Sequence, residues 1–335
     1  MASRHFIFSI FIISTLVPQF ESRIISDLSI REKHEQWIAR YGREYKDTAE
    51  KNERYEIFKA NIEYINLVNN VGNKPYKLSV NQFADKTNEE FMATRLSYKS
   101  TPNTKPASST TFLYENFTAI PPSIDWRKQG AVTSIRDETC GAWTFPAVDT
   151  VEGITKIKNG KLYNLSIQEI LDCDTSADGN GCDGGFVSEA FDFIKQNGLT
   201  TESNYPSKEK PGSCDKKKEA QHVAKISSYE KIPADNEAAL MKAVAYQPIA
   251  VSLDASGPSF QFYSSGVFTG QCGTTLNHGV TVVGYGTENG KLKYWIIKNS
   301  WGTTWGEEGY MRLQRDTDEK EGLCGIAMDA LYPVV

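Results

Sequence analysis

Polar and apolar residues in the first hundred positions are spaced as they are in amphipathic helices. Residues 27–98 are rich in Glu, Lys, Asn and aromatic residues. One series recurs at intervals of three or four residues, which keeps its members on a single helix face. Its members are Glu50, Arg54, Phe58, Asn61, Ile65 and Asn69. This spacing predicts a long helix in the segment.

A second helical pattern lies in the middle of the chain. Apolar residues recur every three positions from Phe145 to Ile154 and predict a helix over residues 143–158. Proline is tolerated in a helix only within its first turn, so Pro146 requires this helix to begin close to Gly141. Two further helices are predicted over residues 166–172 and 188–196.

After about residue 245 the pattern changes to short apolar runs bounded by Gly, Pro and Asn. These runs predict strands over residues 249–253, 279–285, 294–298 and 310–313. Helices come first and strands afterwards, which indicates an α+β fold.

Two segments are typical of processing rather than of a folded core. Residues 1–23 carry Arg4 and His5 before an apolar run, which is too short to span a membrane and is placed like a secretory signal. A buried N-terminal strand is the alternative. Residues 99–119 are rich in Ser, Thr, Pro and Asn and predict an exposed linker where processing occurs. Glycosylation sequons begin at Asn116 and Asn164.

Composition narrows the possible partners and the compartment. The net charge of −5 and the pI of about 5.6 leave no basic footprint for nucleic acid. No other stretch of the chain is long and apolar enough to cross a bilayer. Six cysteines, all after residue 139, predict three disulfides in a secreted chain. Spacing alone leaves their connectivity open.

Several short motifs follow one another in a fixed order. They are the helical series from Glu50 to Asn69, Ser79-x-Asn81-x-Phe83-x-Asp85, Ile120-Pro-Pro-Ser-Ile-Asp-Trp126, Thr139-Cys-Gly-Ala-Trp-Thr-Phe145, Leu276-Asn-His-Gly-Val280 and Lys298-Asn-Ser-Trp-Gly302. In this combination the chain resembles plant-type papain-like cysteine proteases with an inhibitory propeptide of the I29 type.

The resemblance implies a domain organisation. It predicts a signal peptide over residues 1–23, a helical propeptide over 24–98, the processing linker over 99–119 and a papain-like domain over 120–335. That domain has two lobes, one helical and one β-barrel-like, with a substrate cleft between them.

The resemblance also implies catalytic residues, and two of them are replaced here. His278 corresponds to the family's general base and Asn299 to the amide that orients it. The nucleophilic cysteine belongs immediately before Trp143, where the chain has Ala142. Asp137 stands in place of the glutamine that stabilises the oxyanion, and an ionised carboxylate offers no donor. A catalytically disabled protease homologue is therefore predicted.

Two rival hypotheses remain open. The chain is an active endopeptidase if Cys140 acts as the nucleophile, or if one cysteine between Ala142 and Trp143 was lost through a sequence error. It is instead a storage or inhibitor-titrating protein if the cleft has no peptide ligand. The family's disulfides imply the pairs Cys140–Cys182, Cys173–Cys214 and Cys272–Cys324. A nucleophilic Cys140 would leave Cys182 unpaired.

The resemblance leaves peptide-binding elements in place. Gly184 and Gly185 correspond to glycines that hydrogen-bond an extended peptide. The resemblance implies that the main specificity pocket is lined by Phe186, Val187, Ser252, Gly279 and Asp329. The alternative is that these residues only pack the interface between the lobes. An exposed Asp329 would favour basic side chains.

The expected partners are extended peptides or protein segments, the chain's own propeptide and cystatin-like inhibitors. Nucleic acid is not expected as a partner, nor is a membrane once the signal is removed. No cofactor and no metal are expected. The predicted protein is a monomer in the secretory pathway, with an extracellular or vacuolar/lysosomal destination.

Overall fold

The fold is taken from a computed structural model of the 335-residue chain that describes residues 29–96, 112–137, 140–174 and 181–335. The predicted signal segment lies outside the described residues. The chain divides into two units, one formed by residues 1–64 with 84–87 and the other by residues 65–83 with 88–335.

The first unit is helical, as the spacing predicts. A helix over residues 29–41 precedes α2, Thr48–Asn70, which begins in this unit. Phe58 is buried and its ring centroid lies 5.5 Å from that of Trp37. Asn61 Nδ2 donates to two carbonyl oxygens, those of Ala84 and Lys86, at 2.9 Å each. The polar residues of the predicted helix face therefore fix the backbone of the turn at residues 84–86.

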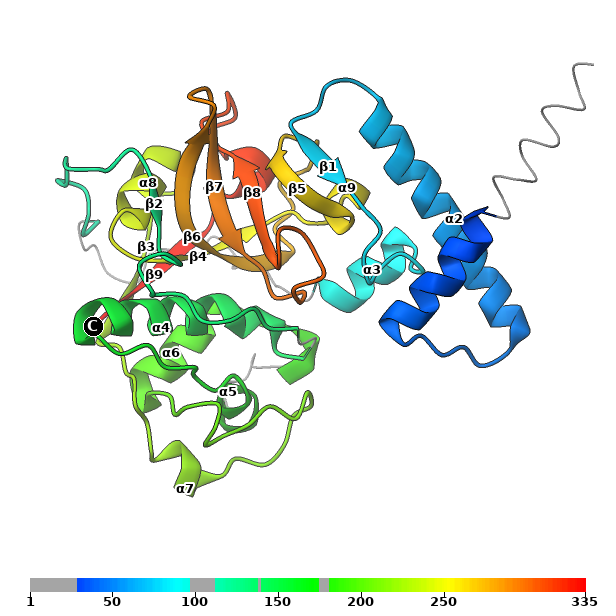
Figure 1. Cartoon of the computed structure of the whole chain (residues 1–335). Coiled ribbons are helices and arrows are strands. Elements are labelled where there is room, and N and C mark those ends of the chain that lie inside the picture. The colour runs from blue at the N-terminus through cyan, green and yellow to red at the C-terminus, as the bar shows by residue number, and fades with distance from the viewer. Residues whose placement is uncertain (1–28, 97–111, 138–139, 175–180) are drawn as a thin grey trace, which may run out of the picture. The chain divides into compact units, whose positions relative to one another are not determined.

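The second unit contains the end of α2 and the remaining elements, shown in Figure 1. Its helices are α3 Asn88–Arg95, η1 Ala142–Thr144, α4 Phe145–Asn159, α5 Gln168–Cys173, η2 Gly181–Asp183, α6 Val187–Asn197, α7 Lys216–Glu219, α8 Glu237–Val244, α9 Pro258–Gln261 and η3 Leu323–Gly325. Its strands are β1 Tyr76–Leu78, β2 Ile124–Asp125, β3 Ser228–Lys231, β4 Ile249–Leu253, β5 Tyr263–Phe268, β6 His278–Glu288, β7 Leu292–Lys298, β8 Tyr310–Gln314 and β9 Ala330–Val334.

The strands form one sheet within the described part of the chain. Their order is β1-β5-β8-β7-β6-β4-β9-β3, and β2 pairs with β6 outside this path. The pairs are antiparallel except for β5 with β8, which run parallel. The four strands predicted after residue 245 are confirmed as β4, β6, β7 and β8. The burial of β4 and β6 on both faces explains why these two segments read as continuous apolar runs.

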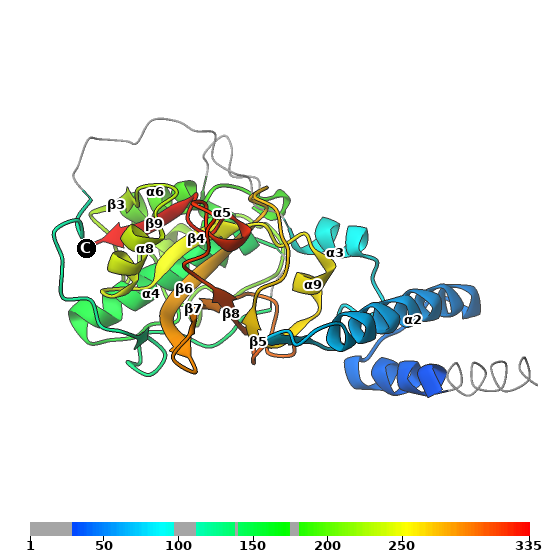
Figure 2. The same ribbon diagram turned by 90° about the horizontal axis from the view of Figure 1, so that it is seen from above.

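Helices α4 to α7 lie together below the strands in Figure 1, and Figure 2 shows the same unit from above. The predicted helix over residues 143–158 is confirmed as α4, with the short 3₁₀ helix η1 directly before it. Pro146 lies in its first turn, where the missing N–H costs nothing. Val148 and Val151 are buried, and α4 packs against β4, β6 and β9. The α+β, two-lobed architecture is thereby confirmed.

Buried charges join α4 to the strands. Lys298 Nζ on β7 lies 2.8 Å from Asp149 Oδ1 and 2.9 Å from Thr133 Oγ1. Asp149 also accepts a hydrogen bond from Thr281 Oγ1 on β6. The side chains of Lys298 and Asp149 are only 2% and 8% exposed. This ion pair connects the helical lobe to the β lobe.

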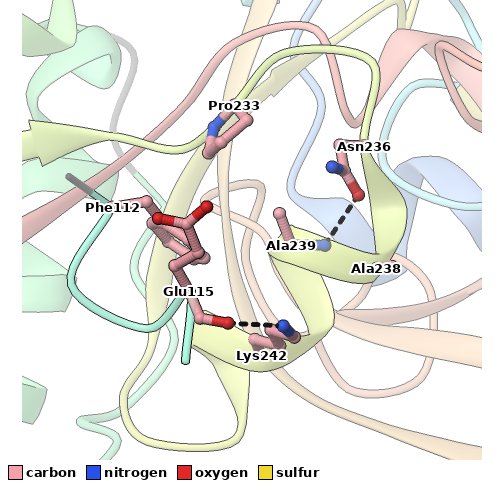
Figure 3. A pocket seen from close by; sticks show the side chains of 7 residues that line it. All are labelled: Phe112, Glu115, Pro233, Asn236, Ala238, Ala239 and Lys242. Carbon is pink, nitrogen blue, oxygen red and sulfur yellow. Dashed lines mark hydrogen bonds between the residues drawn. The ribbon is translucent and has the colours of Figure 1, made fainter. Parts of the chain in front are cut away.

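Residues 112–119, here called the N-terminal strap, lie along α8. Tyr114 is buried, and its ring stacks on that of Tyr246 with the centroids 5.3 Å apart. Lys242 Nζ donates to the carbonyl oxygen of Glu115 at 2.7 Å (Figure 3). A cavity of about 420 Å³ lies between the strap and α8. It is lined by Phe112, Glu115, Pro233, Asn236, Ala238, Ala239 and Lys242. The part of the predicted linker that is described is therefore packed onto the domain.

Candidate active site

The backbone before α4 places residue 142 at a helix start. Gly141 adopts φ = 77°, and a Cβ there would lie 2.7 Å from the Leu171 side chain, so only glycine fits. Both the backbone N–H and the hydroxyl of Thr144 donate to the Gly141 carbonyl oxygen. η1 packs against β6, whose first residue is His278. Unpaired N–H groups at a helix start favour an anion, but Ala142 offers only a buried methyl group.

The predicted base and its orienting amide come together. His278 Nε2 lies 2.8 Å from Asn299 Oδ1, and both side chains are buried. An amide oxygen only accepts hydrogen bonds, so this contact places the imidazole proton on Nε2 and leaves Nδ1 as the basic nitrogen. The Trp301 ring stacks on the imidazole with the centroids 4.6 Å apart. The dyad is thus oriented as a base requires.

The charge state of His278 is set by burial. The pKa of His278 is lowered to about 4 in total: burial lowers it most, the hydrogen bond to Asn299 opposes this shift, and the positive charge of Arg95 adds to it. In a working Cys–His site a thiolate would stabilise the imidazolium. Residue 142 supplies no such partner, so His278 is neutral above about pH 4.

Asp137 is held against the backbone that follows the dyad. It forms an isolated antiparallel bridge with Trp301, and a Cβ on Gly302 would lie 2.7 Å from Asp137 Oδ2. Its Oδ1 lies 2.9 Å from Arg95 Nη1 at the end of α3. The position that the resemblance assigns to the oxyanion donor therefore holds a carboxylate that is paired with a cation, and an ionised carboxylate has no donor for a substrate oxygen.

The predicted peptide-binding glycines pack on the same helix start. Gly185 lies over the Trp143 indole, where an added Cβ would come within 2.9 Å of the ring. Gly184 adopts φ = 92°. Trp143 Nε1 donates to the Gly181 carbonyl oxygen at 2.9 Å. Packing against Trp143 therefore requires glycine at residue 185, independently of any ligand. Beyond the pair, Phe186 begins the turn into α6 and Val187 is buried.

Two predicted pocket residues are brought together by strand pairing. Ser252 on β4 is opposite Gly279 on β6, one register position from His278. Asp329 is 4% exposed, and its Oδ1 lies 2.8 Å from Lys231 Nζ. A preference of Asp329 for basic substrate side chains would require an exposed carboxylate, and this carboxylate is buried. Its charge is neutralised inside the protein.

The six cysteines form three disulfides. They are Cys140–Cys182, Cys173–Cys214 and Cys272–Cys324, the pairs that the family resemblance implies. Since the structure describes all six, no cysteine of the sequence carries a free thiol. Cys173 and Cys214 lie close to Glu219, but sulfurs joined to each other are not thiolate ligands for a metal.

Sequence reasoning missed Arg95. It lies 42 positions before its partner Asp137, in a segment whose motif ends at Asp85. No local pattern marks such a contact. Trp301 was noted in the sequence only as part of a motif. Its ring nevertheless contacts both the His278 imidazole and the Phe91 ring of α3, and the Trp301 and Phe91 centroids lie 5.1 Å apart.

Comparison with known proteins places this geometry in a family. The family model described as papain family cysteine protease matches residues 120–334, and the cathepsin propeptide inhibitor domain (I29) matches residues 34–91. Senescence-specific cysteine protease SAG39 of Oryza sativa subsp. indica is 50% identical over 312 residues, which cover 92% of this chain and 91% of the relative.

Two further similarities extend over the propeptide and the domain together. Senescence-specific cysteine protease SAG12 of Arabidopsis thaliana is 49% identical over 319 residues, covering 92% of each chain. The solved structure of a recombinant stem bromelain precursor superposes with a TM-score of 0.84 at 44% identity, covering 92% of this chain and 99% of that one.

Proposed function

Because the chain belongs to the papain family of cysteine proteases, we propose that it binds extended peptide segments in that family's cleft and does not cleave them through a cysteine. One observation carries this proposal. Ala142 stands at the start of the active-site helix, and every cysteine of the chain is in a disulfide. A methyl group has no lone pair for attack on a carbonyl carbon.

The surroundings of residue 142 support the same proposal. Asp137 provides an acceptor where the family provides a donor, and a negative charge there opposes the oxyanion of an acyl-transfer transition state. Removal of a single oxyanion donor lowers turnover by about 10²–10³-fold in a protease that keeps its nucleophile. The replacements at residues 142 and 137 together argue that peptide cleavage has been lost. Gly184 and Gly185 remain for peptide binding.

The comparisons favour a second candidate, an active cysteine-type endopeptidase, because the relatives are named as cysteine proteases. Activity in this chain needs a thiol from somewhere. Cys173 is buried and bonded to Cys214, and Cys140 is bonded to Cys182. Either cysteine would have to be released by reduction. A cysteine missing from the sequence between Ala142 and Trp143 would supply the thiol without reduction.

A thiol assay separates the two candidates. The propeptide is removed from the full-length protein by an added metalloprotease, which is then inactivated with EDTA. The processed protein is exposed without reductant to an epoxide thiol trap and to a fluorogenic dipeptide substrate, with stem bromelain as the positive control. We expect no free thiol after denaturation, no mass increase and no turnover above the blank. Epoxide labelling of Cys140 or Cys173, or epoxide-sensitive turnover, would refute the proposal. Resequencing the transcript across codons 136–146 tests the missing-cysteine hypothesis.

The binding half of the proposal needs its own measurement. A fluorescently labelled panel of extended peptides is titrated with protein from which the propeptide has been removed by an added protease, and the unprocessed proprotein serves as the blocked-cleft control. Saturable binding that the proprotein lacks supports a peptide-binding cleft. A protein without nucleophile and without peptide binding would instead fit the storage or inhibitor-titrating role, for which a cystatin-like inhibitor is the partner to test.

The proposed setting is the secretory pathway, with an extracellular or vacuolar/lysosomal destination. Three disulfides support it, because they persist in oxidising compartments. Both proposed glycosylation residues, Asn116 and Asn164, are on the surface. Among the described residues, no helix has both the length and the apolar character needed to cross a membrane. The propeptide segment is the first proposed partner, and the protein is proposed to be monomeric.

A further inference from the structure

The replaced oxyanion residue makes a specific contact. Asp137 Oδ1 and Arg95 Nη1 lie 2.9 Å apart, and the side chains are 49% and 14% exposed. Arg95 is the last residue of α3, in the propeptide segment. Its guanidinium lies over the Phe83 ring, with Cζ 5.0 Å from the centroid. The cation is therefore held from two sides, by a carboxylate and by an aromatic face.

This contact lies beside the catalytic remnant. The backbone of Asp137 pairs with Trp301, whose indole stacks on the His278 imidazole. The charge of Arg95 contributes to the lowered pKa of His278, which places the guanidinium within the electrostatic reach of the imidazole. Arg95 thus pairs with the residue at the position that the family resemblance assigns to the oxyanion donor.

The surface below the propeptide suits a flat cation. Phe83 and Phe91 pack edge-on against the Trp301 ring, which is buried and also contacts Phe260 and Trp305. If Phe83 and Phe91 leave with the propeptide, an indole is uncovered next to the Asp137 carboxylate. A carboxylate beside an aromatic face binds guanidinium better than ammonium, because guanidinium is planar, weakly hydrated and able to stack.

We propose that Asp137 has turned the former oxyanion position into a guanidinium-binding subsite, which Arg95 fills in the proprotein and an arginine side chain of a bound peptide fills after propeptide release. This proposal deepens the proposed function, since it names the side chain that the cleft prefers. Cation recognition in this cleft is thereby assigned to Asp137 rather than to Asp329, whose charge is already paired with Lys231.

Chemical rescue tests the subsite in the full-length proprotein. An Arg95→Ala variant removes the guanidinium, and hydrogen exchange of the α3 amides reports how firmly α3 is held. We expect exchange about two- to fivefold faster than in the wild type, the range for a partly exposed ion pair. Millimolar ethylguanidinium should restore slow exchange, whereas ethylammonium at the same ionic strength should restore it less. Rescue should be lost in Arg95→Ala/Asp137→Asn.

A Glu89→Gln variant is the matched control, because it changes one charge of the same helix and leaves the pair intact. Ethylguanidinium should leave its exchange unchanged. Equal rescue with and without the Asp137 carboxylate, or no rescue at all, would overturn the subsite. If Arg95→Ala disturbs folding, the Asp137→Asn single variant gives a second reading, since it should loosen α3 by the same factor.

A peptide pair then separates this inference from the proposed function. A labelled extended peptide containing one arginine is compared with the same peptide containing the neutral isostere citrulline, using protein from which the propeptide has been removed. We expect the arginine peptide to bind about two- to fivefold more tightly, and the difference to vanish in the Asp137→Asn variant. Equal affinity for the two peptides overturns the arginine preference alone. Absence of binding by either peptide, together with guanidinium rescue, counts against the peptide-binding function and leaves the subsite standing.

Discussion

His278 shows how the absence of an anionic partner changes the chemistry of a buried imidazole. Its hydrogen bond to Asn299 at 2.8 Å is the contact that a catalytic base needs. A base that is buried without an anionic partner nevertheless resists protonation, and the pKa of His278 falls to about 4. The residue keeps its orientation, while its ability to form an ion pair depends on a thiolate that position 142 does not supply.

We expect His278 to make the protein acid-sensitive. In the unfolded chain His278 takes up a proton near its ordinary pKa of 6.5, but in the fold only near 4. The unfolded state therefore binds more protons within this window, so stability falls as the pH decreases from about 6.5 to 4, by about 3 kcal/mol in total. Melting temperatures of wild type and His278→Gln across this pH range check it. The variant should lose less stability on acidification, and a pH-independent difference between the two would contradict the expectation.

We expect that restoring a cysteine at residue 142 restores thiol reactivity, and that turnover also requires a glutamine at residue 137. Ala142→Cys places a thiol at the helix start, where a thiolate is favoured, so we expect epoxide labelling in acid-activated protein. Turnover should stay low because Asp137 still opposes the oxyanion. Ala142→Cys/Asp137→Gln should exceed Ala142→Cys by about 10²–10³-fold in kcat on a fluorogenic dipeptide. Ala142→Ser/Asp137→Gln is the control for the thiol, and equal activity of the two cysteine variants would show that Asp137 is not the obstacle.

At the scale of elements, the sequence predicted those helices and strands whose apolar residues recur with a regular local spacing. The apolar series from Phe145 to Ile154 marks the buried face of α4, and the runs after residue 245 correspond to β4, β6, β7 and β8. Strands β1, β2, β3, β5 and β9 were not predicted. β5 contains Ser264, Ser265 and Gly266, and gains its place by pairing with β1 and β8, which are far away in sequence.

The site shows the same division between motif and distant contact. His278 and Asn299 could be assigned because each lies in a recognisable short motif. The Arg95–Asp137 pair and the Lys231–Asp329 pair could not, because their partners are 42 and 98 positions apart and carry no shared pattern. Only the fold brings such residues together, and in both cases the distant contact changes what the carboxylate does.

The N-terminal strap allows a prediction about processing. Its aromatic residues pack on Tyr246 and Tyr332, so we expect it to resist proteolysis and cleavage to occur before Phe112. Tyr246→Ala removes the ring on which Tyr114 stacks and should make residues 112–119 susceptible. Intact mass and N-terminal sequencing after limited proteolysis check this expectation. Lys161→Ala, an exposed change on a different element, is the control, and a wild-type terminus inside 112–119 would contradict the prediction.

At the scale of the whole molecule, any peptide cleft depends on how firmly the helical and β lobes are joined. Lys298 on β7 and Asp149 on α4 form a buried ion pair between them. Buried pairs add little stability compared with apolar packing, but removal of one partner leaves an uncompensated charge. The pair therefore specifies how the lobes meet and makes that junction sensitive to single substitutions.

Lys298→Met should be among the most destabilising single changes in the domain. It leaves the Asp149 carboxylate without its cation, at a cost of about 3–5 kcal/mol. For a domain of this size that corresponds to a decrease in Tm of roughly 10 °C, measurable by calorimetry. Lys298→Met/Asp149→Leu removes both charges and should recover most of the loss, because apolar packing replaces the pair. If the double variant is less stable than Lys298→Met alone, the charges are not acting as a pair, and the junction of the lobes must depend on the other contacts of Asp149, such as the hydrogen bond from Thr281.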